Sequence, residues 1–248
     1  MKRLKTILDS HYLRELRLLR ENVPSFDEYP FNLPVIRTLE TLHFHPKVTY
    51  IIGENGSGKS TLLEALAVAW GYNAEGGDRD IPFSTNSTHS DLYLYLRLVK
   101  GPSKAYEGFF LRAESFYNVA TVNDNLGRSH KKFGGLALHE QSHGESFFSL
   151  FMHGFTGNGV YFLDEPEAAL SPMRQMAMLT RLHQLIGMQS QFIIATHSPI
   201  VMAYPDAQIL LLSEDGIREV AYEETEHFFV TREFLANREK MLRILLKE

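Results

Sequence analysis

Cysteine is absent from this sequence of 248 residues. Disulfides and thiolate chemistry both need cysteine, so the absence excludes a disulfide-stapled fold and a thiol nucleophile. No apolar run approaches the roughly 20 residues that a membrane-spanning helix requires. The charged N-terminal segment also lacks the continuous apolar stretch of a signal peptide. From these absences we expect a cytoplasmic protein, which would associate with a membrane peripherally and only as the subunit of a transporter.

Positive charge is not in excess either. The chain has 25 Lys and Arg against 30 Asp and Glu, a formal net charge of −5, so no overall basic field indicates nucleic acid. Two local segments are basic, and each is either a DNA contact or a solvated face. Their basic residues are Lys2, Arg3, Lys5, Arg14, Arg17 and Arg20 in the first, and Arg128, His130, Lys131 and Lys132 in the second.

Strand and helix patterns alternate along the chain. This order favours a single α/β domain over 1–248, with a mainly parallel core sheet flanked by helices and an added antiparallel β element. Residues 1–34 are predicted to form a basic lead-in and a loop. Strands are expected at 47–52, 159–163, 191–195, 208–212 and 217–222, and helices at 60–70, 172–186 and 231–248. The antiparallel element is expected over 91–112, as strands 91–99 and 108–112 joined by a turn.

A phosphate-binding loop is the strongest motif in the sequence. Gly53 to Ser60 matches G-x-x-x-x-G-K-[ST] without a gap, between a predicted strand and a predicted helix. Glycines let the backbone aim its N–H groups inward, and the helix adds its positive N-terminal end. The motif predicts a nucleoside triphosphate site in which Lys59 meets the β- and γ-phosphates and Ser60 ligates Mg²⁺. Its nucleotide-binding residues are Gly53, Glu54, Asn55, Gly56, Ser57, Gly58, Lys59, Ser60 and Thr61.

Two acidic residues and a histidine follow the later buried strands. Asp164 and Glu165 come directly after an apolar run. We expect Asp164 to hold Mg²⁺, directly or through water, and Glu165 to act as the general base toward the attacking water. His197 follows the predicted strand 191–195, and the carboxyl ends of parallel strands share one edge of a sheet. We therefore expect His197 to contact the γ-phosphate.

The stretch Ser142, His143, Gly144, Glu145 precedes another predicted helix start, a setting suited to an anion but weak as a signal by itself. In chain order, the phosphate loop, this stretch, Asp164-Glu165 and His197 resemble the ABC class of P-loop ATPases, from about Leu39 to Pro199. The S-x-G-E form is more similar to chromosome-maintenance and recombination ATPases than to the transporter form LSGGQ. Residues 165–172 and 196–199 resemble the small stand-alone bacterial AAA-family ATPases of ABC type.

One feature departs from the ABC pattern. These ATPases usually carry a metal-contacting glutamine between the phosphate loop and the signature, but no glutamine lies between Thr61 and Glu140. Glu114 and Asn118, just after a predicted strand, are the nearest candidates. Glu114 is as well explained as a loop acid as by a role as metal ligand. Since that glutamine couples transporters to their membrane partner, the departure argues against ordinary transporter coupling.

The resemblance implies an ATPase that uses ATP and Mg²⁺ as a homodimer. In this class the signature of one subunit completes the site of the other, so Ser142 and Gly144 would act in trans on the nucleotide held by the partner. ATP binding would close the dimer and hydrolysis would reopen it, while residues 168–171 would cross between subunits. The effector stays open between DNA (in repair or defence), a membrane permease and a regulatory protein partner.

Overall fold

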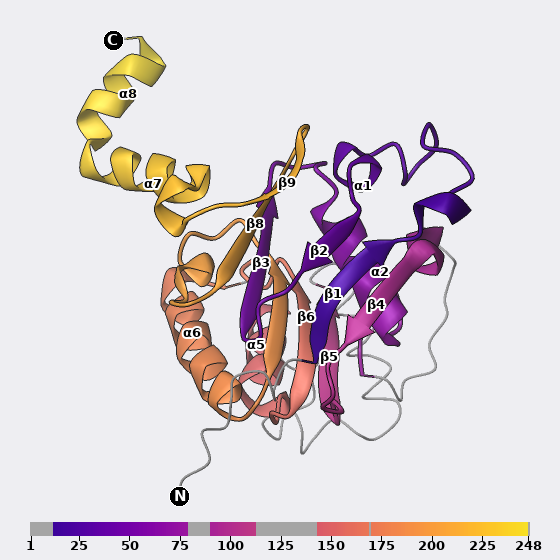
Figure 1. Ribbon diagram of the computed structural model, residues 1–248. Helices are drawn as coiled ribbons and strands as arrows, with labels where there is room; N and C mark the ends of the chain where they lie inside the picture. The colour runs from indigo at the N-terminus through magenta and orange to yellow at the C-terminus, as the bar shows by residue number, and fades with distance from the viewer. Residues whose placement is uncertain (1–11, 79–89, 113–142, 169, 248) are drawn as a thin grey trace, which may run out of the picture.

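The computed structural model of the chain describes residues 12–78, 90–112, 143–168 and 170–247. A six-stranded sheet in the order β5-β6-β7-β3-β8-β9 forms its centre (Figure 1). Neighbouring strands run parallel except at β9, which pairs antiparallel with β8. The predicted α/β fold with a mainly parallel core sheet is confirmed. The strands are β3 (Val48–Gly53), β5 (Glu107–Arg112), β6 (Gly159–Asp164), β7 (Gln191–Ala195), β8 (Gln208–Ser213) and β9 (Gly216–Glu219).

The central strands are buried on both faces. All six residues of β3 are buried, and successive side chains point to opposite sides of the sheet. Tyr50 and Ile52 therefore belong to one hydrophobic core, while Ile51 belongs to the other. A sheet covered on both faces explains why β3, β6 and β7 read as continuous apolar runs rather than as alternating ones.

Helices cover the two faces of this sheet. The helix α2 (Lys59–Trp70) packs into the core on one face and ends at Gly71, whose φ of 114° is left-handed. On the other face lie α5 (His143–Ser149), a π-helical turn (Leu150–Gly154) and α6 (Pro172–Gly187). Short helical segments connect these elements: α1 (Pro34–Arg37), and 3-10 turns at Arg20–Asn22, Asp91–Tyr95, Val201–Ala203 and Tyr222–Glu224.

A second, three-stranded antiparallel sheet corrects the prediction for residues 1–34. Its order is β2 (Thr41–His43), β1 (Leu13–Leu18) and β4 (Leu96–Lys100). The segment read as a basic lead-in thus contains the central strand of this sheet. Leu16 and Leu18 are buried, while Arg14 and Arg17 point to solvent. The amphipathic pattern of this segment belongs to a strand with one solvated face, not to a lead-in.

The same sheet shows that the predicted hairpin over 91–112 is wrong. Residues 91–95 form a 3-10 turn, and β4 pairs with β1, with Leu98 opposite Leu16. The expected partner strand, β5, instead joins the core sheet parallel to β6. The antiparallel element therefore exists, but its strands are β1, β2 and β4. Alternation predicts a half-buried strand without saying which strand it pairs with.

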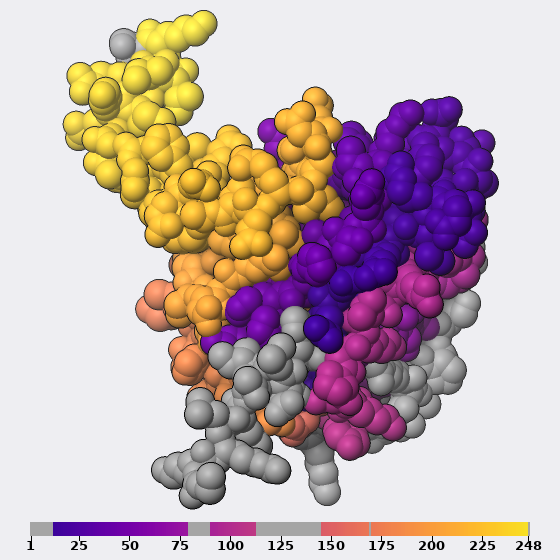
Figure 2. Space-filling view, in the orientation of Figure 1, coloured from indigo at the N-terminus to yellow at the C-terminus, as the bar shows by residue number. Residues whose placement is uncertain are grey.

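The C-terminal segment is two helices instead of the single one predicted over 231–248. They are α7 (Glu226–Ala236) and α8 (Arg238–Leu246), interrupted at Asn237, and neither has a buried residue. This segment stands away from the body of the molecule (Figures 1 and 2). By contrast, the predicted strand pair before it is confirmed as β8 and β9. Within the described residues, no helix combines the length and apolar character needed to cross a bilayer.

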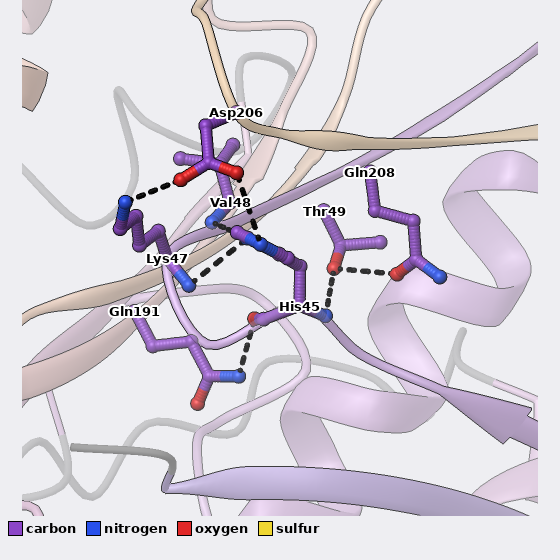
Figure 3. A network of polar contacts seen from close by, with 7 residues as sticks. All are labelled: His45, Lys47, Val48, Thr49, Gln191, Asp206 and Gln208. Atoms are coloured by element: carbon purple, nitrogen blue, oxygen red, sulfur yellow. Dashed lines mark hydrogen bonds and ion pairs between the residues drawn. The ribbon is translucent and has the colours of Figure 1, made fainter. Parts of the chain in front are cut away.

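Polar side chains join the starts of the strands at the amino-terminal edge of the core sheet (Figure 3). The Thr49 hydroxyl accepts from the backbone N–H of His45 at 2.9 Å and donates to Gln208 Oε1 at 3.1 Å. Lys47 forms an ion pair with Asp206. Because the predicted site residues follow the opposite, carboxyl ends of the strands, this network is structural.

Gln191 ties the two sheets together. Its side chain is fully buried, donates to the carbonyl of Leu13 at 2.7 Å and to that of His45 at 3.0 Å, and accepts from the Leu13 N–H at 2.8 Å. We expect Gln191→Leu to lower the free energy of unfolding by about 3 kcal/mol, because it strands three buried backbone groups. Urea unfolding would show this as a lower midpoint at unchanged m-value.

Gln208→Leu is the matched control for this prediction. Gln208 begins the neighbouring strand β8, but it is only partly buried and pairs with Thr49 and the exposed Glu219 side chain. Its loss should cost about 1 kcal/mol or less. Equal midpoint shifts for the two variants would contradict the role assigned to Gln191.

Candidate functional site

The predicted site residues come from three neighbouring strands that end at one edge of the core sheet. Between β3 and α2 lies the loop 53–58, β6 ends at Asp164, and β7 is followed by residues 196–199. In the order β6-β7-β3 these strands are adjacent. Parallel pairing therefore brings the loop, the acidic residues and His197 to one edge, as expected.

Two glycines of the loop hold positions that a side chain would not tolerate. Gly53 has a φ of 149°, and a Cβ there would lie 2.4 Å from the carbonyl oxygen of Leu212. Gly58 precedes α2 with a φ of 94°, and a Cβ would approach Val35 Cγ2 to 3.0 Å. The tight turn thus requires glycine at both ends. It leaves the first N–H groups of α2 directed at the loop, as anion binding requires.

Lys59 begins α2 and is almost completely buried. Its Nζ donates to the carbonyls of Gly53 and Glu54, each at 2.9 Å, so the ammonium group lies inside the turn of the loop. Burial lowers the pKa of Lys59, and the carboxylates of Glu165, Asp164 and Glu167 oppose that shift. A triphosphate would offer this cation stronger acceptors than neutral carbonyls do.

Ser60 and Asp164 meet across the site, although 104 positions separate them in the sequence. Ser60 Oγ donates to Asp164 Oδ1 at 3.1 Å. A hydroxyl beside a carboxylate is the oxygen donor set that Mg²⁺ uses with nucleotide phosphates. In the described parts of the chain, no group of three or more His, Asp or Glu could hold a metal by itself. The pair therefore fits a metal that also binds phosphate oxygens, and Ser57 Oγ, buried without a hydrogen-bond partner, could donate to such a phosphate.

Glu165 directly follows Asp164 but has a different environment. Its φ of 48° is left-handed, which is uncommon for a residue with a long side chain. Its N–H donates to the Ala195 carbonyl at 2.9 Å, which fixes this turn against β7. The side chain is 43% exposed, and its Oε1 lies 3.6 Å from His197 Nε2. A strained residue that presents a partly exposed carboxylate at a cluster of this kind is a candidate for function.

Glu167 was not among the predicted site residues. Its Oε1 accepts from the backbone N–H of His197 at 2.6 Å and of Ser198 at 3.2 Å, so it fixes the loop that carries the histidine. Burial raises the pKa of Glu167, and the hydrogen bond from the His197 N–H opposes the rise. Its position two residues after Glu165 in the same acidic stretch was the available signal.

The loop 196–199 has further supports. Ser198 Oγ donates to Gln175 Oε1 at 2.6 Å and accepts from the N–H groups of Ile200 and Val201, both at 3.1 Å. The Tyr222 hydroxyl donates to the Pro199 carbonyl at 2.8 Å. The loop is therefore anchored to α6 and to the segment that precedes α7, which limits the freedom of His197.

Tyr29 is a second residue that the prediction missed. Its hydroxyl lies 3.2 Å from Thr61 Oγ1, and the residue is 63% exposed. An exposed aromatic ring beside a phosphate loop can stack on a nucleotide base. The surrounding prolines had indicated only a loop, because the sequence does not show which distant loop lies beside the first turn of α2.

Several predicted residues lie outside the described parts of the chain. These are Ser142, Glu114, Asn118, residue 169 of the predicted crossing segment, the N-terminal Lys2, Arg3 and Lys5, and the basic residues 128–132. His143 and Gly144 begin α5, and Glu145 lies on its exposed side, 3.7 Å from Arg174. Arg112, opposite Asp164 in the strand register, ends β5 two positions before Glu114. The chain thus leaves β5 beside Asp164.

A family model described as an AAA domain matches residues 21–142. No curated protein matches the chain. Among solved structures, cbiO1 from Clostridium perfringens, part of the ABC transporter complex cbiONQ, is 17% identical, with a TM-score of 0.48 over 81% of this chain and 88% of that one.

Two further solved structures are similar. The SMC head domain from Thermotoga maritima is 17% identical, with a TM-score of 0.43, and the match covers 84% of this chain and 98% of that one. A dimeric ATP-binding cassette bound to ADP and phosphate is 16% identical, with a TM-score of 0.43 over 75% and 90% of the two chains. At such identities these similarities concern the fold alone.

Proposed function

We propose that the chain is an ABC-class P-loop ATPase domain over 1–248, and that it binds ATP with Mg²⁺ and hydrolyses ATP as a homodimeric switch. The match of residues 21–142 to an AAA-domain family model supports this proposal. The observation that carries this proposal is the 3.1 Å contact between Ser60 Oγ and Asp164 Oδ1, next to the buried ammonium group of Lys59. A cation and a hydroxyl at the start of α2, with a carboxylate at the end of β6, form a site suited to a metal-bound polyphosphate.

In this proposal the loop binds the phosphates and the strand ends supply the chemistry. Backbone N–H groups of 53–61 and Lys59 hold the triphosphate, while Ser60 and Asp164, with Glu114 as a candidate third group, hold Mg²⁺. When bound, the metal neutralises charge that develops on the phosphate oxygens. Glu165 takes a proton from the attacking water. His197 donates from Nε2 to the γ-phosphate.

The dimer follows from the signature. We propose that Ser142, His143, Gly144 and Glu145 complete the site of a second copy, so that each nucleotide lies between two chains. ATP would then close the dimer and hydrolysis would open it. This mechanism makes turnover depend on protein concentration, because a single chain has only half of each site.

DNA is the effector that we propose to test first, although the basic residues in and just after β1 support it weakly. Arg20 donates to the carbonyls of Arg37 at 2.7 Å and Leu39 at 3.1 Å, and Arg17 pairs with Glu15. Both cations therefore already have partners within the chain, which reduces the charge left for a phosphate backbone. A permease and a regulatory protein partner are the alternatives.

Steady-state ATP turnover per subunit, measured against protein concentration with and without linear duplex DNA, tests the proposal. We expect turnover to rise with concentration as dimers form, and to rise further with DNA. A rise with concentration alone would keep the dimeric switch and favour a protein or permease partner. No turnover at any concentration would contradict the ATPase assignment.

A further inference from the structure

Residues 222–227, which include the start of α7, touch the loop 196–199 at two points. One is the hydrogen bond from the Tyr222 hydroxyl to the Pro199 carbonyl. The other joins two histidines, since His227 Nε2 lies 3.1 Å from His197 Nδ1, with ring centroids 5.3 Å apart. His227 belongs to α7, the helix that begins the projecting arm (Figure 1). His197, the candidate γ-phosphate contact, therefore has His227 as a hydrogen-bond partner, and the proposed mechanism has given His227 no role.

The position of His227 is well fixed. Thr225 caps α7, as its hydroxyl accepts from the Phe228 N–H at 3.3 Å and donates to the Tyr222 carbonyl at 2.7 Å. Thr225 is only 2% exposed. His227 is the second residue of α7 and lies two positions after the capping residue Thr225. The cap therefore fixes the backbone from which the His227 side chain reaches His197.

Two neutral imidazoles that share one hydrogen bond must divide the roles of donor and acceptor. Burial and then the charge of Lys59 lower the pKa of His197, and burial and then His197 lower that of His227, so both rings are neutral near pH 7. Either His227 Nε2–H donates to His197 Nδ1, or the reverse. A neutral imidazole carries one N–H proton. In the first arrangement the proton of His197 is on Nε2, and in the second it is on Nδ1.

The surroundings favour His227 as the donor. In that arrangement His197 carries its proton on Nε2, which is buried without a hydrogen-bond partner in the described chain and lies 3.6 Å from the carboxylate oxygen Glu165 Oε1, too far for a hydrogen bond but close enough for electrostatic attraction. His227 Nδ1 is then a lone pair, buried without a hydrogen-bond partner in the described chain. A lone pair near the positive N-terminal end of α7 costs less than an unpaired N–H there. The other charged groups that act on the pair are Lys59, Glu167 and Glu226.

We propose that His227 is a positioning residue that fixes the tautomer of His197, so that His197 presents an Nε2–H donor to the γ-phosphate. The inference rests on the proposed function, in which His197 contacts that phosphate. A His197 with its proton on Nδ1 would instead present a lone pair to an anion, which is repulsive. Through this hydrogen bond, the C-terminal helix α7 contacts the residue that would bind the γ-phosphate.

ATP turnover of two full-length variants tests the proposal. His227→Phe removes the donor at similar size, and we expect kcat to fall about tenfold or more, with the Kd for Mg²⁺–ATP unchanged within about twofold. His227→Gln keeps an N–H donor near the position of Nε2 and should recover kcat to within about threefold of wild type. His183→Phe is the matched control. His183 lies on α6, where its Nδ1 is 2.9 Å from the Tyr204 hydroxyl, and its replacement should leave kcat unchanged.

Nitrogen NMR of the nucleotide-free protein gives a readout that does not need turnover. We expect His197 Nδ1 to show the shift of an unprotonated imidazole nitrogen in wild type, and a mixture of tautomers in His227→Phe. A proton on Nδ1 of His197 in wild type, or a kcat of His227→Phe within twofold of wild type, would overturn the proposal. If the wild-type protein did not hydrolyse ATP, the proposed function would fail, while the NMR result would still decide the tautomer.

Discussion

Replacing Glu165 by glutamine is expected to slow ATP turnover by about 100-fold or more, the effect typical of losing a general base. Glutamine keeps the size of the side chain and adopts the same left-handed backbone at no greater cost. It cannot take a proton from water at neutral pH. Because Lys59, Ser60 and Asp164 are untouched, Mg²⁺–ATP should still bind. The variant should therefore accumulate as an ATP-bound dimer, which size-exclusion chromatography with and without ATP can detect.

Glu219→Gln provides the control for this experiment. Glu219 is likewise a glutamate at a strand end, but it is exposed, lies on β9 and pairs with Gln208. Its replacement should leave turnover and the oligomeric state unchanged. If Glu165→Gln kept turnover within twofold of wild type, the assignment of Glu165 as the base would be wrong, even if the phosphate loop bound ATP.

Lys59→Ala is expected to abolish tight ATP binding. The ammonium group is the one cation buried inside the turn of the phosphate loop in the described chain, and alanine leaves the carbonyls of Gly53 and Glu54 facing the phosphates. Losing a charge-assisted contact of this kind costs about 1.5–3 kcal/mol, and the exposed carbonyls add repulsion, so we expect a Kd at least about 100-fold weaker. Isothermal titration calorimetry with Mg²⁺–ATP measures it.

Lys47→Ala is the matched control. Lys47 pairs with Asp206 at the opposite, amino-terminal edge of the sheet (Figure 3). Its replacement removes the same charge from the chain without touching the loop, so it separates a local contact from a change in net charge. Equal ATP affinity for Lys59→Ala and wild type would refute the loop as the nucleotide site.

The parts of the fold that the sequence predicted correctly are those in which local pattern and tertiary environment coincide. The strands β3, β6 and β7 lie in the middle of a sheet covered on both faces, so they needed continuous apolar runs. Glycines and polar residues bound these runs, which is why predicted and observed ends agree within one residue. The tight turn between β3 and α2 was also predicted from its glycines and lysine, because the backbone geometry of this loop depends on residues that are adjacent in the sequence.

The errors arose where a strand needed a distant partner. The sequence predicted that the strand containing residues 96–100 pairs with the next strand across a short turn. Instead, β4 pairs with β1, and β5 pairs with β6. A single alternating pattern is compatible with either choice, since it specifies one buried face and no neighbour. The same limit applies to β1. Its leucines are buried in the core that also contains residues of α2, and the sequence pattern of β1 does not specify this partner.

The candidate site divides in the same way. By itself the sequence predicted a nucleoside triphosphate as the ligand, since this prediction needs only the order in the chain of a phosphate-loop motif, an acidic strand end and a histidine after a later strand. Only the tertiary structure decided that Glu167 holds the histidine loop, that Tyr29 borders Thr61 and that His227 lies behind His197. Each of these contacts joins segments about 30 residues apart, and no local pattern specifies which loops the packing of two hydrophobic cores brings together.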